Sequence, residues 1–284
     1  MIFETHAHYD DEKFAEDREE VLADLPKRGI RPVINVGASI ESTKTTLEIA
    51  ESHDFVYAAV GVHPSDIDGL NEETFAWLAE QTKHQKTVAI GEIGLDYYWD
   101  KEADVQKQQR YWFRRQLELA RREMLPVIIH SRDAAEDTMD ILQEFHRMTK
   151  RDDSDVTSRT GLANDTSEQG YCWDETPGVI HCYSYSLEMA HEFIKMGYYI
   201  GVGGVVTFKN AKKLVRTVEE IPMERILLET DCPYMAPEPH RGTRNDSRNI
   251  PYVIEKIAQI KGIDPKVVEE TARENAFRLF TKAV

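Results

Sequence analysis

The chain has 284 residues, of which 41% are hydrophobic and 30% are charged, a composition that suits a globular protein with a substantial core. This length fits one large α/β barrel or two average domains. The formal net charge of −16 argues against a general coat for nucleic acid, because long-range repulsion slows encounter with a polyanion, but it does not exclude an enzyme that has a few local cations.

Apolar runs of strand length alternate along the chain with longer amphipathic stretches. Strands are predicted at 2–6, 32–36, 56–62, 87–93, 126–130, 178–182, 198–202 and 225–230. Helices are predicted at roughly 12–28, 40–52, 71–83, 102–123, 133–148, 186–196, 210–219 and 248–260. Eight strand–helix units imply a parallel sheet, and eight strands close a (β/α)8 TIM barrel. An additional helix is expected at 265–280, after the last unit.

One segment interrupts this alternation. Residues 150–177 contain few aliphatic side chains and many Asp, Ser, Thr and Gly residues. A long polar insertion of this kind is usually a surface loop or a flexible flap. We expect it within a single barrel domain that spans 1–284, at the end of the barrel away from the site, because it precedes a strand.

Side chains that bind divalent metals stand at the predicted ends of five strands. They are His6 and His8, Glu92, His130, His181 and Asp231. Each one alone has an ordinary structural explanation, such as a satisfied core histidine or a salt-bridged carboxylate. Five strands that each end in such a residue are much harder to explain by chance. A catalytic site at the carboxyl ends of barrel strands draws single residues from many strands in this way.

The number of candidate ligands favours two metal ions. One open catalytic ion needs three protein ligands and water, and four histidines with two carboxylates exceed that. We expect His6, His8 and Asp231 to hold one ion, His130 and His181 the other, and Glu92 to bridge them. Asp231 can also accept a proton from the attacking water, so Glu92 and Asp231 are the predicted catalytic residues. This is hydrolytic chemistry.

Two further carboxylates should lie beneath these ligands. Strand alternation places Glu4 on the same face as His6, and Glu229 on the same face as Asp231. Buried carboxylates need partners, so we expect both to hydrogen-bond and orient the ligands above them. Pairing with cations inside the barrel is the alternative.

Seven motifs resemble the TatD family of metal-dependent deoxyribonucleases, which have the metal-dependent hydrolase barrel. They are THAHYD at the start, GVHP at 61–64, GEIGLDYY at 91–98, PVIIHSRDA at 126–134, HCYS at 181–184, ETDCPY at 229–234 and PHRGTRN at 239–245. The resemblance covers nearly the whole chain. It implies a hydrolase that cleaves DNA as an exonuclease on single-stranded ends, with His6, His8, Glu92, His130, His181 and Asp231 as ligands of the divalent metal.

The chain departs from the family pattern in several places. Glu4 stands where the family usually has Asp, and Ser65 follows GVHP in place of a common His. HCYS replaces the more usual HCFSG, and the 150–177 insertion is unusual. None of these changes removes a predicted ligand, but the change at Ser65 puts a substrate contact there in doubt.

A phosphodiester substrate also needs positive groups around the metals. Arginine binds phosphate oxygens in a bidentate manner, and the loops after strands five and eight carry such groups. The predicted substrate-binding residues are His63, Arg132, His240, Arg241 and Arg244. A surface loop that is salt-bridged to acidic neighbours is the alternative. Tyr97 and Tyr98 could stack a base, although packing under the loop is the ordinary role of such residues.

Three functions fit this set of residues. The first is a two-metal DNA phosphodiesterase. The second is a hydrolase of the same fold that acts on a small carbonyl or phosphotriester substrate. Many such relatives bridge their metals with a carboxylated lysine at the end of strand four, where Glu92 stands here, and this favours the nuclease. The third, a binding protein that lost catalysis, fits poorly with a complete ligand set.

The remaining expectations concern metal, location and partners. Histidine ligands favour Zn, Mn or Fe, whereas phosphoryl chemistry often uses Mg. The first residues do not form a signal peptide, and no apolar run approaches the roughly 20 residues of a membrane span. Three cysteines without a CxxC motif suit a reducing compartment. We expect a cytoplasmic protein with DNA as its partner and no obligate protein partner.

Overall fold

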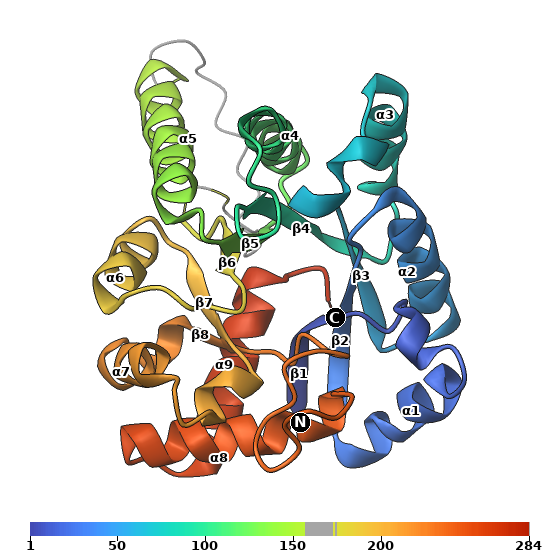
Figure 1. Ribbon diagram of the computed structural model, residues 1–284, viewed down its shortest axis with the longest axis vertical. Helices are drawn as coiled ribbons and strands as arrows, with labels where there is room; N and C mark the ends of the chain where they lie inside the picture. The colour runs from blue at the N-terminus through green and yellow to red at the C-terminus, as the bar shows by residue number, and fades with distance from the viewer. Residues whose placement is uncertain (157–172, 174, 284) are drawn as a thin grey trace.

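The computed structural model describes residues 1–156, 173 and 175–283. Within them, eight parallel strands form one sheet in the order of the sequence. They are β1 (Ile2–Ala7), β2 (Ile30–Val36), β3 (Val56–Val60), β4 (Thr87–Asp96), β5 (Val127–Arg132), β6 (Gly178–Ile180), β7 (Tyr199–Val202) and β8 (Ile226–Leu228). A parallel bridge joins Ala7 to Cys232, just beyond β8. The sheet is therefore a nearly closed barrel (Figure 1), and the predicted (β/α)8 fold is confirmed.

Helices follow the strands and surround the barrel (Figure 1). In the described part of the chain they are α1 (Arg18–Asp24), α2 (Ile40–Ser52), α3 (Glu72–Gln81), α4 (Ala103–Arg122), α5 (Ala135–Val156), α6 (Leu187–Lys195), α7 (Lys212–Glu220), α8 (Ile250–Lys261) and α9 (Pro265–Leu279). In α4, buried Trp112, Phe113, Leu117 and Ala120 recur at helical spacing. This apolar stripe holds the helix against the barrel, since the hydrophobic effect stabilises an amphipathic helix on its apolar side.

The first predicted helix, 12–28, is wrong in its extent. The structure has α1 between two short 3-10 helices, Glu12–Phe14 and Pro26–Arg28. Pro26 cannot donate a helical hydrogen bond, and Gly29, with a φ of 74°, ends the second 3-10 helix in the left-handed conformation. The amphipathic pattern is present, but proline and glycine break the helix before β2.

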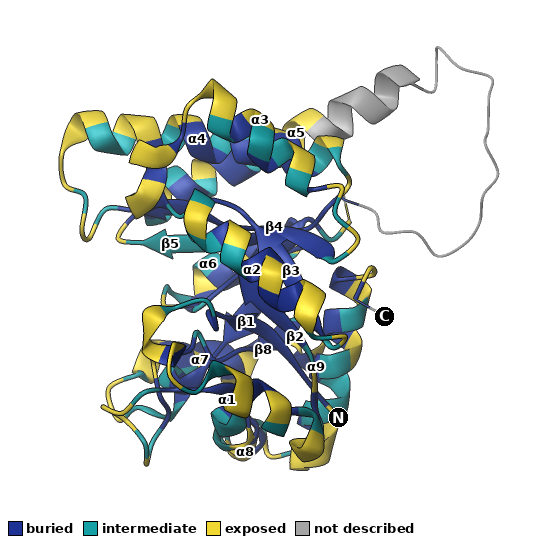
Figure 2. Cartoon of the chain, turned by 90° about the vertical axis from the view of Figure 1, so that its right-hand side faces the viewer, coloured by how far each residue is buried: buried dark blue, intermediate teal, exposed yellow. Residues whose placement is uncertain are grey.

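The additional C-terminal helix covers one end of the barrel. Buried residues of α9 pack with the interior residues of the strands, and Phe3, early in β1, lies 5.1 Å from Phe277 and 6.0 Å from Phe280 between ring centroids. Both chain termini lie at this end (Figure 2). The amino ends of the strands are therefore closed by apolar packing, and the carboxyl ends remain for a site.

Six strand ends differ from the prediction by one to three residues, those of β1, β3, β4, β5, β6 and β8. β4 continues to Asp96, three residues beyond its predicted end, whereas β6 and β8 stop at Ile180 and Leu228, two residues before theirs. α5 continues to Val156, into the segment predicted as an insertion. Most of that insertion, 157–172 and 174, lies outside the described residues.

None of the helices in the described part is both long and apolar enough to cross a membrane.

Candidate metal centre

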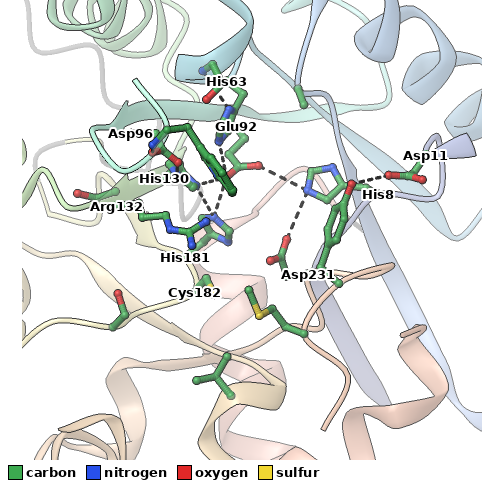
Figure 3. Close-up of a pocket in the computed structure, with 18 of the residues that line it drawn as sticks. His8, Asp11, His63, Glu92, Asp96, His130, Arg132, His181, Cys182 and Asp231 are labelled. Atoms are coloured by element: carbon green, nitrogen blue, oxygen red, sulfur yellow. Dashed lines mark hydrogen bonds and ion pairs between the residues drawn. The ribbon is translucent and has the colours of Figure 1, made fainter. Parts of the chain in front are cut away.

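The six predicted ligands meet at the carboxyl ends of the strands. Five strands or the turns just after them supply the side chains, and a cleft of about 900 Å³ opens above them. Figure 3 shows that His8, Glu92, His130, His181 and Asp231 point toward a common centre. Candidate ligands that are far apart in sequence therefore come within a few ångströms of one another.

The two histidines of β1 face Asp231. The Nε2 atoms of His6 and His8 lie 2.9 Å apart, and Asp231 Oδ1 lies 3.7 Å from the first and 3.6 Å from the second. His8 Nδ1 donates to the Val36 carbonyl oxygen at 2.8 Å. Because a carbonyl only accepts, this bond assigns the proton of neutral His8 to Nδ1 and leaves a lone pair on Nε2, toward the centre.

Glu92 lies between two sets of histidines. Its Oε2 lies 3.5 Å from Nε2 of both His6 and His8. Its Oε1 lies 2.7 Å from His181 Nε2 and 2.8 Å from His130 Nδ1. Each carboxylate oxygen thus faces a different pair of imidazoles, which is the arrangement expected of a bridging carboxylate.

The carboxylates of this cluster stay ionised although they are buried. Burial opposes ionisation of Glu92, but the surrounding imidazoles, His181 foremost, hold its pKa well below the usual value. Burial also opposes ionisation of Asp231. Its contact with His8 and the charges of the nearby histidines nevertheless lower its pKa. Burial alone would lower the pKa of His8, yet its carboxylate neighbours, Asp231 foremost, raise it well above 6.5. In the metal-free centre, protons on the histidines therefore neutralise the negative charge of the carboxylates, and a bound cation could take over that role.

The donor set fits divalent metal binding. In the described residues, the ligand atoms of His6, Glu92 and His181 lie within 4.8 Å of one another, and so do those of His6, His8 and Asp231. Buried Nδ1 atoms of His6 and His181 have no hydrogen-bond partner in that part of the chain. Converging imidazole and carboxylate lone pairs repel one another unless protons or cations lie between them, and zinc-like cations prefer this mixture of ligands.

Asp96 also belongs to this cluster, although it was not predicted as a site residue. Its Oδ2 lies 3.1 Å from His130 Nε2, opposite the ring nitrogen that faces Glu92. A carboxylate behind a ligand histidine fixes the ring orientation. Glu92 and Asp96 stand four residues apart on one strand, hence on one face, but the predicted strand stopped at residue 93. The spacing of Glu92 and Asp96 could have indicated this residue, but the strand was assigned an end before Asp96.

Gly94, between these two carboxylates, allows β4 and β5 to approach. Its φ of 146° lies in a region that L-residues rarely adopt, and a Cβ there would collide with the His130 carbonyl oxygen. The glycine therefore lets His130 sit between Glu92 and Asp96.

His63 lies beside the cluster in a different tautomer. Its Nδ1 accepts a hydrogen bond from the Ser65 backbone amide at 3.1 Å, so the proton of the neutral ring is assigned to Nε2. That nitrogen faces Glu92 Oε1 at 3.8 Å. Burial lowers the His63 pKa to about 3. His63 is therefore a neutral hydrogen-bond donor directed into the cleft rather than a lone-pair donor.

Glu4 and Glu229 lie beneath the ligands, but they contact backbone rather than imidazole rings. Glu4 accepts from the His6 amide at 3.1 Å and from the amide and hydroxyl of Thr230 at 3.0 and 2.7 Å. Glu229 Oε1 accepts from the Cys182 amide at 2.5 Å. They brace the segments that carry the ligands. The strand-alternation argument for Glu229 was wrong, because β8 ends at Leu228 and Asp231 has a left-handed φ of 56°.

Glu229 should make the metal-free protein less stable at high pH. Burial raises its pKa to about 8 from 4.5. Because this pKa is raised in the folded state, Glu229 contributes to the free energy of unfolding at low pH. The contribution is complete below pH 4.5 and is lost as the pH rises through 8, and the loss is on the order of a few kcal/mol. We expect Glu229→Gln, measured in a chelator by thermal unfolding, to match wild type near pH 5 and to melt several degrees higher near pH 9. Equal melting temperatures at both pH values would contradict this.

The predicted substrate-binding residues divide into two groups. His63, Arg132 and Arg241 line the cleft. Arg244 instead forms a salt bridge with Asp17, and His240 packs on Tyr252 with ring centroids 5.0 Å apart. The loop after β8 directs these last two to neighbouring protein groups outside the cleft lining, and their part in substrate binding stays a prediction.

Tyr97 packs against the protein, which is the role given above as the alternative to stacking a base. Its hydroxyl donates to Asp137 at 2.5 Å and accepts from Arg110 at 2.8 Å, and Tyr97 is not among the residues that line the cleft. Tyr98 differs, because its ring is 42% exposed.

Comparison with known proteins agrees with this geometry. Residues 3–281 match the family described as TatD related DNase. The chain is 41% identical to an uncharacterized metal-dependent hydrolase, YabD, of Bacillus subtilis, over 99% of both chains. It is 30% identical to a protein named 3'-5' ssDNA/RNA exonuclease TatD of Cronobacter sakazakii, over 99% of this chain and 98% of the relative.

A solved structure has the same fold. The TatD homologue YJJV of Escherichia coli superposes with a TM-score of 0.81 at 28% identity, covering 99% of this chain and 98% of that one. The match along the sequence, the barrel and the buried cluster of histidines and carboxylates agree with one another. The chain belongs to the TatD family of metal-dependent hydrolases.

Proposed function

We propose that this hydrolase cleaves phosphodiester bonds of DNA, as an exonuclease on single-stranded ends, with two divalent ions. The observation that carries the proposal is Glu92, whose two oxygens face two separate histidine pairs. His6, His8 and Asp231 would hold one ion, His130 and His181 the other, and Glu92 would bridge them. Ions bound there would lower the pKa of water and polarise the phosphodiester.

The chain's own groups complete the reaction. Asp231 is an ionised carboxylate in the centre, so it can accept a proton from the attacking water. His63 presents an N–H to the cleft, where a non-bridging phosphate oxygen can accept it. Arg132 and Arg241, which line the same cleft, supply the positive charge that a phosphodiester needs.

The relatives' names support a nucleic-acid substrate. The family description contains DNase, and one relative is named as an exonuclease on single-stranded DNA and RNA. A small carbonyl or phosphotriester substrate is the second candidate, because the centre alone would also serve that chemistry. The cations of the cleft favour the phosphodiester, since a neutral lactone does not need them. Among Zn, Mn, Fe and Mg, the ligand set suits the first three by softness.

A digestion assay tests this function. The purified protein, treated with a chelator and then given Mg, Mn or Zn, is incubated with end-labelled single-stranded DNA. We expect a ladder of shortened products that needs added metal, and slower digestion of a blunt duplex. The control is the chelated protein without metal. Turnover of a lactone or a phosphotriester, with no shortening of DNA in any metal, would support the second candidate instead.

A further inference from the structure

Two adjacent aromatic side chains are exposed where β4 meets the cleft. Trp99 is 66% exposed and Tyr98 is 42% exposed. Their rings lie edge to face with centroids 4.7 Å apart, and Trp99 is part of the cleft lining. Exposing an indole to water is unfavourable, and an exposed apolar patch beside a cleft is one mark of a ligand-binding groove.

A cation lies over the same two rings. The Arg132 guanidinium is 4.0 Å from the centroid of Tyr98 and 5.5 Å from that of Trp99. Arg132 also lines the cleft, two residues after His130 on β5. Aromatic faces for bases, next to a cation for the backbone, are the combination that single-stranded nucleic acid binds.

Asp96 connects this aromatic pair to the metal centre. Its Oδ1 accepts from the amides of Tyr98 and Trp99 at 2.9 and 3.0 Å, while its Oδ2 faces His130 at 3.1 Å. One buried carboxylate thus fixes both the loop that carries the rings and a candidate metal ligand. A base stacked on Trp99 would have its phosphate held at a constant distance from the centre.

Charge in the cleft is distributed unevenly. Figure 3 shows Arg132 beside His130 and Asp96, and Asp11 on the opposite side, next to His8. Asp11 also accepts a hydrogen bond from the Tyr234 hydroxyl at 2.7 Å. Arg132 therefore places a cation on the side of the cleft that carries the aromatic pair, where it would bind a phosphate of a strand that passes over Trp99.

We propose that Trp99, with Tyr98 and Arg132 beside it, forms a nucleobase subsite, in which the indole stacks a base next to the scissile phosphate. The proposal rests on the proposed function and extends it, because it assigns base recognition to residues outside the metal centre. Stacking does not depend on base identity, so the subsite accepts any sequence but requires an unpaired base. It therefore supplies a physical reason for a preference for single strands.

The test compares a normal strand with a strand that lacks bases. Two end-labelled thymidine strands are used, one of which has abasic sugars at the positions next to the bond that is cut. With wild type, we expect the KM for the abasic strand to be about tenfold higher or more, which is the usual effect of one stacking contact. Trp99→Ala should raise the KM for the normal strand by a similar factor, bring the ratio of the two KM values toward one and change kcat little. Trp99→Phe should restore most of the ratio.

Tyr111→Ala is the matched control. Tyr111 is 49% exposed on α4, so its removal also deletes a surface aromatic, and we expect the KM ratio of wild type. Equal KM values for the two strands with wild type, or an unchanged ratio in Trp99→Ala, would overturn the subsite. Absence of digestion of either strand by wild type in every metal would instead count against the nuclease function.

Discussion

Replacing Asp231 with asparagine should lower the rate of DNA hydrolysis by about 10²–10⁴-fold, the usual contribution of a general base. The Asp231 carboxylate is ionised at neutral pH, because His8 and the nearby imidazole charges outweigh its burial and lower its pKa. Asparagine has nearly the same shape and keeps one oxygen that can bind a metal, but it cannot accept a proton. The loss should therefore fall on kcat, with little change in KM.

The measurement is steady-state digestion of end-labelled single-stranded DNA in saturating Mn. Asp66→Asn is the control, since Asp66 is an exposed carboxylate that lines the same cleft but has no place in the ligand set. It should digest DNA at close to the wild-type rate. If Asp231→Asn retained more than a tenth of the wild-type kcat, while circular dichroism showed an unchanged fold, Asp231 would not be the base.

The barrel could be predicted because its signals are local and repeated. Each strand is an apolar run with a break at both ends, and a slip of two residues, as at Ile180 or Leu228, changes neither the number nor the order of the strands. The predicted ligands came together for the same reason. In a parallel barrel all carboxyl ends lie on one side, so a residue at the end of any strand reaches the common centre.

The features of the site that could not be predicted from the sequence depend on side-chain direction and on strand length. Asp96 was missed because the end of β4 was assigned three residues too early. Arg241 and Arg244 stand three residues apart in one loop, yet only the first lines the cleft, since the second pairs with Asp17 from the segment before α1. Such a pairing joins positions 227 residues apart, and no local pattern predicts it. The tautomer of His63 depends likewise on a turn, in which the Ser65 amide meets Nδ1.

Replacing Glu92 with glutamine should also lower activity strongly, but through loss of bound metal. The carboxylate faces His6 and His8 with one oxygen and His130 and His181 with the other. Glutamine keeps one oxygen and presents an NH2 group in place of the second, which cannot bind a cation. We expect metal content to fall from two ions to one or fewer per chain. Activity should fall with it by more than about 100-fold, because even the partners of metal ligands are worth 10–100-fold.

The number of bound ions distinguishes the effect of Glu92→Gln from the effect of Asp231→Asn. Wild type, Glu92→Gln, Asp231→Asn and Asp66→Asn are dialysed against one Mn concentration, and bound Mn is measured by elemental analysis. Asp231→Asn should keep more metal than Glu92→Gln, because it retains an oxygen ligand and leaves the bridge in place. Two ions in Glu92→Gln would show that Glu92 does not bridge. One ion in wild type would reduce the centre to a single-metal site, in which Glu92 holds His130 and His181 by hydrogen bonds rather than through a second cation.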